Sequence, residues 1–148
     1  MESKKISKQI VDCFKSGNFV YACGNGGSAA MSQHFCAEFM GKFEKIRQPL
    51  PAISLTTDTS FLTAWGNDFE YRDVFVRQLM ALGKKGDILV AFSTSGKSEN
   101  VLNAIIEAKY KKMTVIDFPR KGTSTAKIQE FQLKLMHDIC RLVEKEFI

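Results

Sequence analysis

The sequence predicts an α/β domain built on a doubly wound parallel sheet flanked by helices, as in flavodoxin-like and Rossmann-like three-layer folds. Short apolar runs alternate with amphipathic segments along the chain, which is the pattern of buried strands and covering helices. Polar loops rich in glycine or serine follow two of the apolar runs. No repeat or low-complexity tract interrupts residues 1–148, so we expect one domain.

The chain opens with apolar residues at helical spacing, and Ser16-Gly17-Asn18 supplies the glycine and asparagine that commonly end a helix. The predicted strands are residues 19–23, 51–55, 87–92 and 113–118. The predicted helices that follow the first strand are residues 28–40, a short piece before a turn at Gly66-Asn67-Asp68, and residues 73–82, 99–110 and 123–147.

Composition and charge narrow the function classes. The chain has 148 residues, of which 45% are hydrophobic and 25% charged, and a formal net charge of +5. That charge suits an anionic small molecule, but the basic residues are scattered among acids and form no stripe typical of nucleic-acid binders. The four cysteines have no paired spacing, and no apolar leader follows Met1. We therefore expect reduced thiols, a cytoplasmic location and no membrane-spanning segment.

Residues 93–98 form the most informative loop, Ser93-Thr94-Ser95-Gly96-Lys97-Ser98. The loop joins a buried strand to a helix, and Ser98 is a suitable N-cap residue. Free amides and the positive dipole end of the first helical turn attract anions, so these hydroxyls and amides can hold a phosphate without a lysine. An ordinary serine-rich turn with a capped helix would use the same residue types.

A glycine-rich loop, Gly24-Asn25-Gly26-Gly27-Ser28, follows the first predicted strand and opens the next helix. Such a loop lets a ligand approach the backbone closely. On that helix His34 and Glu38 lie four residues apart and share one face, either as a surface pair or as part of a pocket at the strand ends.

These motifs, in this order, resemble the sugar isomerase (SIS) domain family over nearly the whole chain. The matching segments are Cys23 to Ala30, His34-Phe35-x-Ala37-Glu38, Gly66-Asn67-Asp68, Ser93-Thr94-Ser95-Gly96-x-Ser98, and Ile128-Gln129-Glu130 with His137. The similarity is greatest to members that convert sedoheptulose 7-phosphate to D-glycero-D-manno-heptose 7-phosphate, the first step toward nucleotide-activated heptose for lipopolysaccharide or capsule.

The resemblance implies a role for each matching residue. Ser93, Thr94, Ser95 and Ser98 would hold the sugar phosphate. The sugar would contact Asn25, Gly26, Gly27, Ser28, Asn67 and Asp68. His34, Glu38, Gln129 and His137 would bind one Zn²⁺ per subunit, with Glu38 and Gln129 also contacting substrate. Glu38 and His137 would act as the acid/base pair, and a homotetramer with shared sites is implied.

Spacing supports only part of this set. Gln129 and His137 are eight residues apart, which places them roughly 80° apart around a helix at ~100° per residue. Without the resemblance, His137 could equally be a core histidine, and glutamine is an unusual zinc ligand. Moving a carbonyl between neighbouring carbons nevertheless needs a proton taken from one carbon and delivered to the other, which suits a carboxylate facing an imidazole. A metal or hydrogen-bond donor must also stabilise the enediolate oxygen.

The chain departs from the family pattern in three places. Lys97 stands where a small polar residue is common. Only a few residues separate the strand ending at Phe118 from the helix beginning at Thr123, where the family has a further loop and strand of roughly a dozen or more residues. A leading helix of the family is also expected to be missing at the N-terminus.

Three other functions compete with this one. A non-catalytic SIS protein that binds the bacterial replication initiator would lack the acid at Glu38 and the imidazole at His137. An SIS isomerase or sensor for another sugar phosphate would share most motifs. A nicotinamide enzyme is suggested by Gly24-x-Gly26-x-x-Ala29, but the first acid after the second predicted strand is Asp58, too far downstream to bind the ribose.

Overall fold

The computed structural model describes residues 1–148 and confirms the predicted fold class. The chain forms six α-helices and four short strands, with two of the helices between the second and third strands, and the sheet is entirely parallel, in the order β2-β1-β3-β4. The strands are β1 (Val20–Cys23), β2 (Ala52–Ser54), β3 (Ile88–Ala91) and β4 (Thr114–Asp117). β2 lies on one side of β1, and β3 and β4 lie on the other side. The direction in which successive strands are added therefore reverses between β1 and β3.

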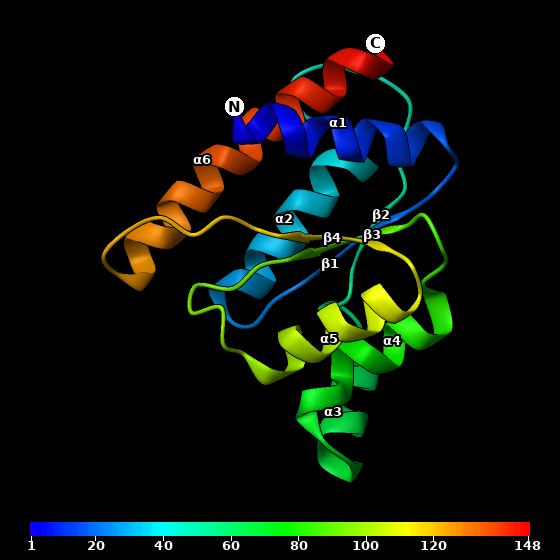
Figure 1. Ribbon diagram of the computed structural model, residues 1–148, viewed down its shortest axis with the longest axis vertical. Helices are drawn as coiled ribbons and strands as arrows, with labels where there is room; N and C mark the ends of the chain where they lie inside the picture. The colour runs from blue at the N-terminus through cyan, green and yellow to red at the C-terminus, as the bar shows by residue number, and fades with distance from the viewer.

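Helices cover both faces of the sheet (Figure 1). On one face lie α1 (Glu2–Lys15), α2 (Gly27–Met40) and α6 (Thr125–Glu144), which pack around a core that includes Phe35, Phe39 and Met136. On the other face α4 (Val74–Leu82) and α5 (Glu99–Tyr110) pack around a core that includes Leu79 and Leu89. Two short 3-10 helices, Tyr71–Asp73 and Lys145–Phe147, complete the structure. The second continues directly from the end of α6.

The helix α3 (Thr59–Asp68) corrects one sequence prediction. Gly66-Asn67-Asp68 was predicted to be a turn, but these residues form the last turn of this helix. The Asp58 side chain caps its N-terminus by accepting a hydrogen bond from the Phe61 amide at 3.0 Å. Trp65 and Phe69 stack one turn apart with ring centroids at 4.3 Å, so aromatic packing at i, i+4 carries the helix through the glycine.

No helix of the chain is both long enough and apolar enough to cross a bilayer. All four cysteines are buried free thiols, as the sequence predicts for reduced cysteines. Burial raises the pKa of Cys23 and Cys36 to about 12, so these thiols stay protonated and unreactive near neutral pH.

Candidate functional site

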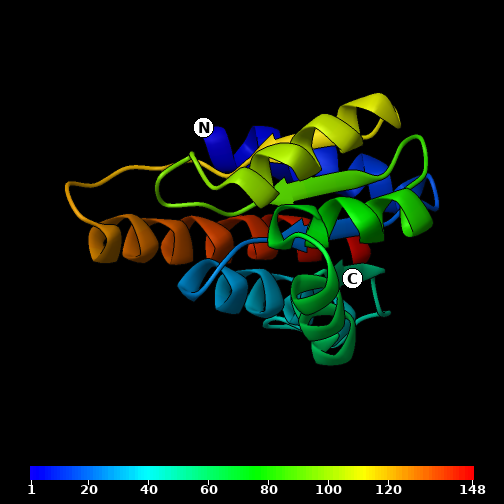
Figure 2. The same ribbon diagram turned by 90° about the horizontal axis from the view of Figure 1, so that it is seen from below.

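The loops predicted to bind ligand lie at one edge of the sheet. In the parallel register Cys23 pairs with Ala91, and Ala91 pairs with Asp117, so three strands end at the same level. The loops after β3 and β4 project together beyond the sheet in both views (Figures 1 and 2). Since the strand order reverses between β1 and β3, this edge is where an open α/β sheet binds its ligand.

Gly24 lets the glycine-rich loop approach the end of β3. A Cβ atom at this position would lie 2.7 Å from the Ser28 carbonyl oxygen and 2.8 Å from the Phe92 carbonyl oxygen, both of them backbone atoms that cannot move aside. The glycine-rich loop therefore packs closely against the backbone of Phe92, the residue just before the serine-rich loop. The start of α2 and the start of α5 lie side by side, because Asn25 just before α2 is hydrogen-bonded to Asn100 in the first turn of α5.

The serine-rich loop is partly organised by its own hydroxyls. The buried Ser93 Oγ accepts a hydrogen bond from the Gly96 amide at 2.9 Å, and Ser95 Oγ accepts one from the Lys97 amide at 3.0 Å. Ser98 is the N-cap residue of α5, as predicted, but its side chain makes no capping hydrogen bond. The Ser98 hydroxyl and the first amides of α5 thus remain available to an anion.

Arg120 is a residue at this loop that sequence analysis missed. Its guanidinium lies against Gly96, where an added Cβ atom would be 3.0 Å from Cζ. The Asp117 carboxylate holds the guanidinium in a bidentate pair, with distances of 2.8 and 2.9 Å, and this pair raises the pKa of Arg120. A fixed positive charge therefore packs against the serine-rich loop. The only sequence signal for it was its place just after a strand.

Asn25 is held by two further residues that were not predicted. The side-chain amides of Asn25 and Asn100 exchange two hydrogen bonds of 2.8 Å, and the Tyr71 hydroxyl donates to Asn25 Oδ1 at 3.0 Å. Because Asn25 gives only one of its two Nδ2 hydrogens to Asn100, one donor remains for a ligand. These residues and Ser98 line a hollow of about 420 Å³.

The predicted acid/base residues lie farther along α2, where this helix packs against α6. His34 and Glu38 share one face of α2, as predicted, with His34 Nε2 3.5 Å from Glu38 Oε1. The His137 ring, from α6, lies edge-on to the His34 ring with centroids 5.3 Å apart. The Glu38 side chain is 19% exposed and that of His34 44% exposed, so a ligand can reach both. Two imidazoles and a carboxylate from distant parts of the chain thus meet between two packed helices.

Gln129 lies apart from these three side chains. Its amide packs on Gly27 at the first turn of α2, in the position a Cβ atom would take. Gly27 is seven residues before His34, or about 10 Å along the helix at ~1.5 Å per residue. No three His, Cys, Asp or Glu side chains converge closely enough to form a metal site in this conformation. The donor types of His34, Glu38 and His137 suit Zn²⁺, whereas Gln129 would have to reorient to join them.

Replacing Gly27 by alanine is expected to displace the Gln129 side chain without unfolding the protein. The backbone of Gly27 does not have the positive φ that favours glycine, and the clash is with the end of a flexible side chain. We expect a change in melting temperature of less than about 3 °C, corresponding to at most ~1 kcal/mol. Zn²⁺ or substrate affinity, measured by calorimetry, should fall. The Gln129→Ala variant is the matched comparison, and unchanged affinity in both variants would remove Gln129 from the site.

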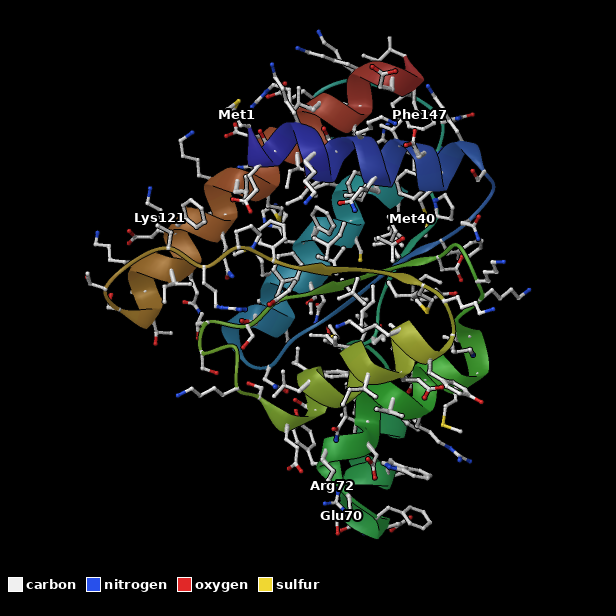
Figure 3. All side chains as sticks on the ribbon, viewed as in Figure 1. Met1, Met40, Glu70, Arg72, Lys121 and Phe147 are labelled. Carbon is white, nitrogen blue, oxygen red and sulfur yellow. The ribbon has the colours of Figure 1, made fainter.

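Asn67 and Asp68 are the predicted site residues that the fold leaves apart. Both are exposed at the end of α3, and their side chains hydrogen-bond to each other, with Asn67 Nδ2 donating to Asp68 Oδ1 at 2.9 Å. Figure 3 labels Glu70 and Arg72 at this extremity, well away from Lys121 in the loop before α6. Within one chain Tyr71, rather than Asn67 or Asp68, reaches Asn25.

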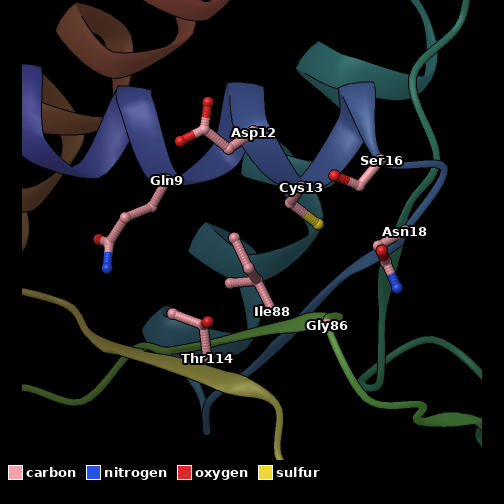
Figure 4. A pocket seen from close by; sticks show the side chains of 8 residues that line it. All are labelled: Gln9, Asp12, Cys13, Ser16, Asn18, Gly86, Ile88 and Thr114. Atoms are coloured by element: carbon pink, nitrogen blue, oxygen red, sulfur yellow. The ribbon is translucent and has the colours of Figure 1, made fainter.

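A separate hollow of about 280 Å³ lies at the other end of the sheet (Figure 4). Gly86 and Ile88 at the start of β3, Thr114 at the start of β4, and Cys13 and Asn18 are among its lining residues. Burial raises the pKa of the Cys13 thiol to about 12, with the Asp87 carboxylate adding to the effect. The hollow faces the amino ends of the strands and shares no residue with the predicted site.

The arrangement is that of a sugar-phosphate isomerase domain, and comparison with known proteins agrees. The SIS domain family matches residues 2–118. The phosphoheptose isomerase of Campylobacter concisus is 46% identical in an alignment of 156 positions, gaps included, that covers 95% of this chain and 82% of the relative. The chain belongs to the SIS domain family, among the phosphoheptose isomerases.

Two solved structures support this assignment. A phosphoheptose isomerase from Neisseria gonorrhoeae superposes with a TM-score of 0.90 at 37% identity, over 97% of this chain and 85% of the other. A phosphoheptose isomerase from Francisella tularensis superposes with a TM-score of 0.92 at 34% identity, over the same shares of each chain. The family resemblance inferred from the sequence motifs is thereby confirmed.

Proposed function

We propose that this chain converts sedoheptulose 7-phosphate to D-glycero-D-manno-heptose 7-phosphate through an enediol, and so supplies heptose for glycans such as lipopolysaccharide or capsule. One observation carries the proposal. A carboxylate and an imidazole from α2 lie beside an imidazole from α6, where these two helices cover one face of the sheet. The phosphate would bind at the start of α5, and Glu38 and His137 would meet the carbonyl end of the sugar in a site shared between subunits.

The reaction needs a proton removed from C1 and a proton delivered to C2. Glu38 would take the C1 proton, whose bonding electrons form the C1–C2 double bond of the enediol while O2 gains a proton. His137 would deliver a proton to C2, and O1 would then lose its proton to become the aldehyde oxygen. A carboxylate and an imidazole suit these transfers near neutral pH. Zn²⁺, held by His34, Glu38, Gln129 and His137, would supply charge to stabilise the enediolate oxygens.

Turnover of the purified protein with sedoheptulose 7-phosphate, with and without a chelator, tests the proposal. Formation of the heptose, and its loss on chelation with recovery by Zn²⁺, is the expected result. Parallel reactions with pentose and hexose phosphates address the alternative of another sugar-phosphate isomerase or sensor. Binding without turnover of any sugar phosphate would favour a sensor. Full activity in the presence of the chelator would exclude the metal from the mechanism.

The double variant Ser95→Ala with Ser98→Ala is expected to weaken substrate binding first. It removes two hydroxyls from the serine-rich loop but leaves Glu38 and His137 in place. At about 0.5–1.5 kcal/mol per hydrogen bond, KM should rise on the order of 10-fold while kcat changes little. Steady-state kinetics measures both constants. A fall in kcat with an unchanged KM would contradict phosphate binding by this loop.

We also propose a homotetramer in the cytoplasm. The helix α3 supports an assembly. None of its residues is buried, although Phe61, Leu62 and Trp65 are apolar, and Phe69 just beyond it is 62% exposed. Apolar residues left at the surface in this way are typical of a protein–protein contact. A neighbouring subunit packed on this helix would also bring Asn67 and Asp68 toward a substrate site. Sedimentation of a lone active species of 16.7 kDa would contradict this proposal.

A further inference from the structure

The segment Lys42–Arg47, between α2 and β2, is held firmly against the end of α6. The Glu144 carboxylate accepts hydrogen bonds from the backbone amides of Phe43, Glu44 and Lys45 at 3.0, 2.8 and 3.0 Å. The Glu44 carboxylate pairs with the Arg141 guanidinium, one turn earlier on α6, at 2.8 Å. Three successive backbone amides and one side chain therefore fix the segment to α6.

Arg47 fixes the other end of the segment to α2. Its side chain is only 1% exposed, and its Nε lies 3.4 Å from Glu144 Oε1. Its guanidinium donates to the backbone carbonyl of Glu38, and also to those of Phe39 and Gly41 at 2.8 and 2.9 Å. The last turn of α2, which carries Glu38, is thus tied to the same segment as α6, which carries His137.

Phe43 brings this segment into contact with the proposed catalytic imidazole. Its ring centroid lies 5.4 Å from that of His137, with 33° between the ring planes. The Arg141 guanidinium lies over the same phenyl ring at 5.6 Å. His34 contacts the His137 ring edge-on, with ring centroids 5.3 Å apart. The His137 imidazole therefore lies between two rings, those of Phe43 and His34. Contacts of this kind restrict the orientation of a ring.

We propose that Phe43 is a positioning residue for the isomerase reaction. By packing against His137 it fixes the plane of the imidazole relative to Glu38, and the Glu144 and Arg47 interactions hold Phe43 in place. The proposal rests on the proposed function, in which His137 delivers a proton to the substrate. Misplacing a proton donor by an ångström can cost up to ~100-fold in rate while leaving the phosphate contacts intact.

Variants of Phe43 separate orientation from simple packing. Phe43→Leu and Phe43→Ala remove the flat ring, whereas Phe43→Tyr keeps it. We expect kcat to fall about 10- to 100-fold in the first two, with KM within about twofold of wild type, and to recover to at least about half in Phe43→Tyr. Phe147→Ala is the matched control, because Phe147 is also half-buried but packs against Phe14, with ring centroids 6.1 Å apart. The Phe147→Ala variant should be less stable than wild type but should have an unchanged kcat.

The histidine spectrum provides a readout that does not depend on turnover. The chain has only two histidines, so the Cε1–H signals of His34 and His137 can be assigned with one variant. In wild type and Phe43→Tyr we expect the His137 signal to be displaced from that of a free imidazole, and in Phe43→Leu to move toward it. A wild-type His137 signal unchanged by Phe43→Leu, or a Phe43→Leu kcat within twofold of wild type, would overturn the proposal. A wild-type protein without turnover would instead overturn the proposed function, and the spectrum would still decide whether Phe43 orients His137.

Discussion

Glu38→Gln is expected to reduce isomerisation of sedoheptulose 7-phosphate by on the order of 10²- to 10⁴-fold, the usual contribution of a general acid or base. Glutamine keeps the shape of the side chain and its place 3.5 Å from His34, but it cannot accept the C1 proton. His137→Asn should cause a loss of similar size, since it removes the imidazole. Steady-state kinetics of both variants measures the effect.

Binding of the phosphorylated ligand is the control for these two variants. The serine-rich loop connects β3 to α5, and neither Glu38 nor His137 belongs to it. Calorimetry should therefore show substrate affinity within a few-fold of wild type, so that kcat carries the loss. Turnover close to wild type in Glu38→Gln would remove this carboxylate from the mechanism.

Glu144→Leu is expected to have the largest effect on stability. Glu144 is 3% exposed, lies 3.4 Å from Arg47 Nε in an ion pair, and accepts hydrogen bonds from three backbone amides. Removing the carboxylate leaves those amides and a buried guanidinium without their partner, which costs about 3–5 kcal/mol. The melting temperature should fall on the order of 10 °C for a chain of this size. Thermal unfolding followed by circular dichroism measures the change.

Glu146→Leu is the matched control for Glu144→Leu. The Glu146 carboxylate lies 3.4 Å from Lys15, but both side chains are more than half exposed. Exposed pairs contribute at most about 1 kcal/mol, so this variant should unfold close to the wild-type temperature. Equal destabilisation by the two substitutions would contradict a special role for the buried carboxylate.

Acid should remove part of the same stabilisation. Burial disfavours the charged form of Glu144, but the amides of Phe43, Glu44 and Lys45 and the charge of Arg47 outweigh it, so the pKa of Glu144 is held below its usual value of 4.5. A lowered folded-state pKa means that the stabilisation is fully present above about pH 4.5 and is lost as pH falls through the folded-state value. The difference in unfolding free energy between wild type and Glu144→Leu should therefore narrow below pH 4.

The sequence predicted the sheet well because its strands are short, continuous apolar runs between polar loops. All four strand residues of β1 and of β3 are buried, which is the environment such runs indicate. The shared face of His34 and Glu38 was also predictable, because it depends only on helical spacing. The turn at Gly66-Asn67-Asp68 was wrong because aromatic packing along α3 outweighed the local preference of glycine and asparagine for turns.

The supporting residues of the site could not be predicted, because their partners are distant in sequence. Asn100 reaches Asn25 across 75 positions, and Glu144 reaches the Phe43 amide across 101. Nothing in the local sequence of Arg47 indicates that it binds three carbonyl groups at the end of α2 or that it is buried. The residues predicted to bind ligand had motif signals, whereas the residues that hold them became visible only from the folded chain.

The central claim is that side chains of α2 and α6 transfer protons to and from an enediol. Isomerisation of sedoheptulose 7-phosphate in D₂O, followed by NMR of the product, tests it most directly. If His137 exchanges with solvent and then delivers the proton, the heptose 7-phosphate formed will carry deuterium at C2. Product formed at the full rate with only protium at C2 would show that the C1 hydrogen itself moves to C2, either directly or on a single base that does not exchange with solvent, and would contradict delivery by His137.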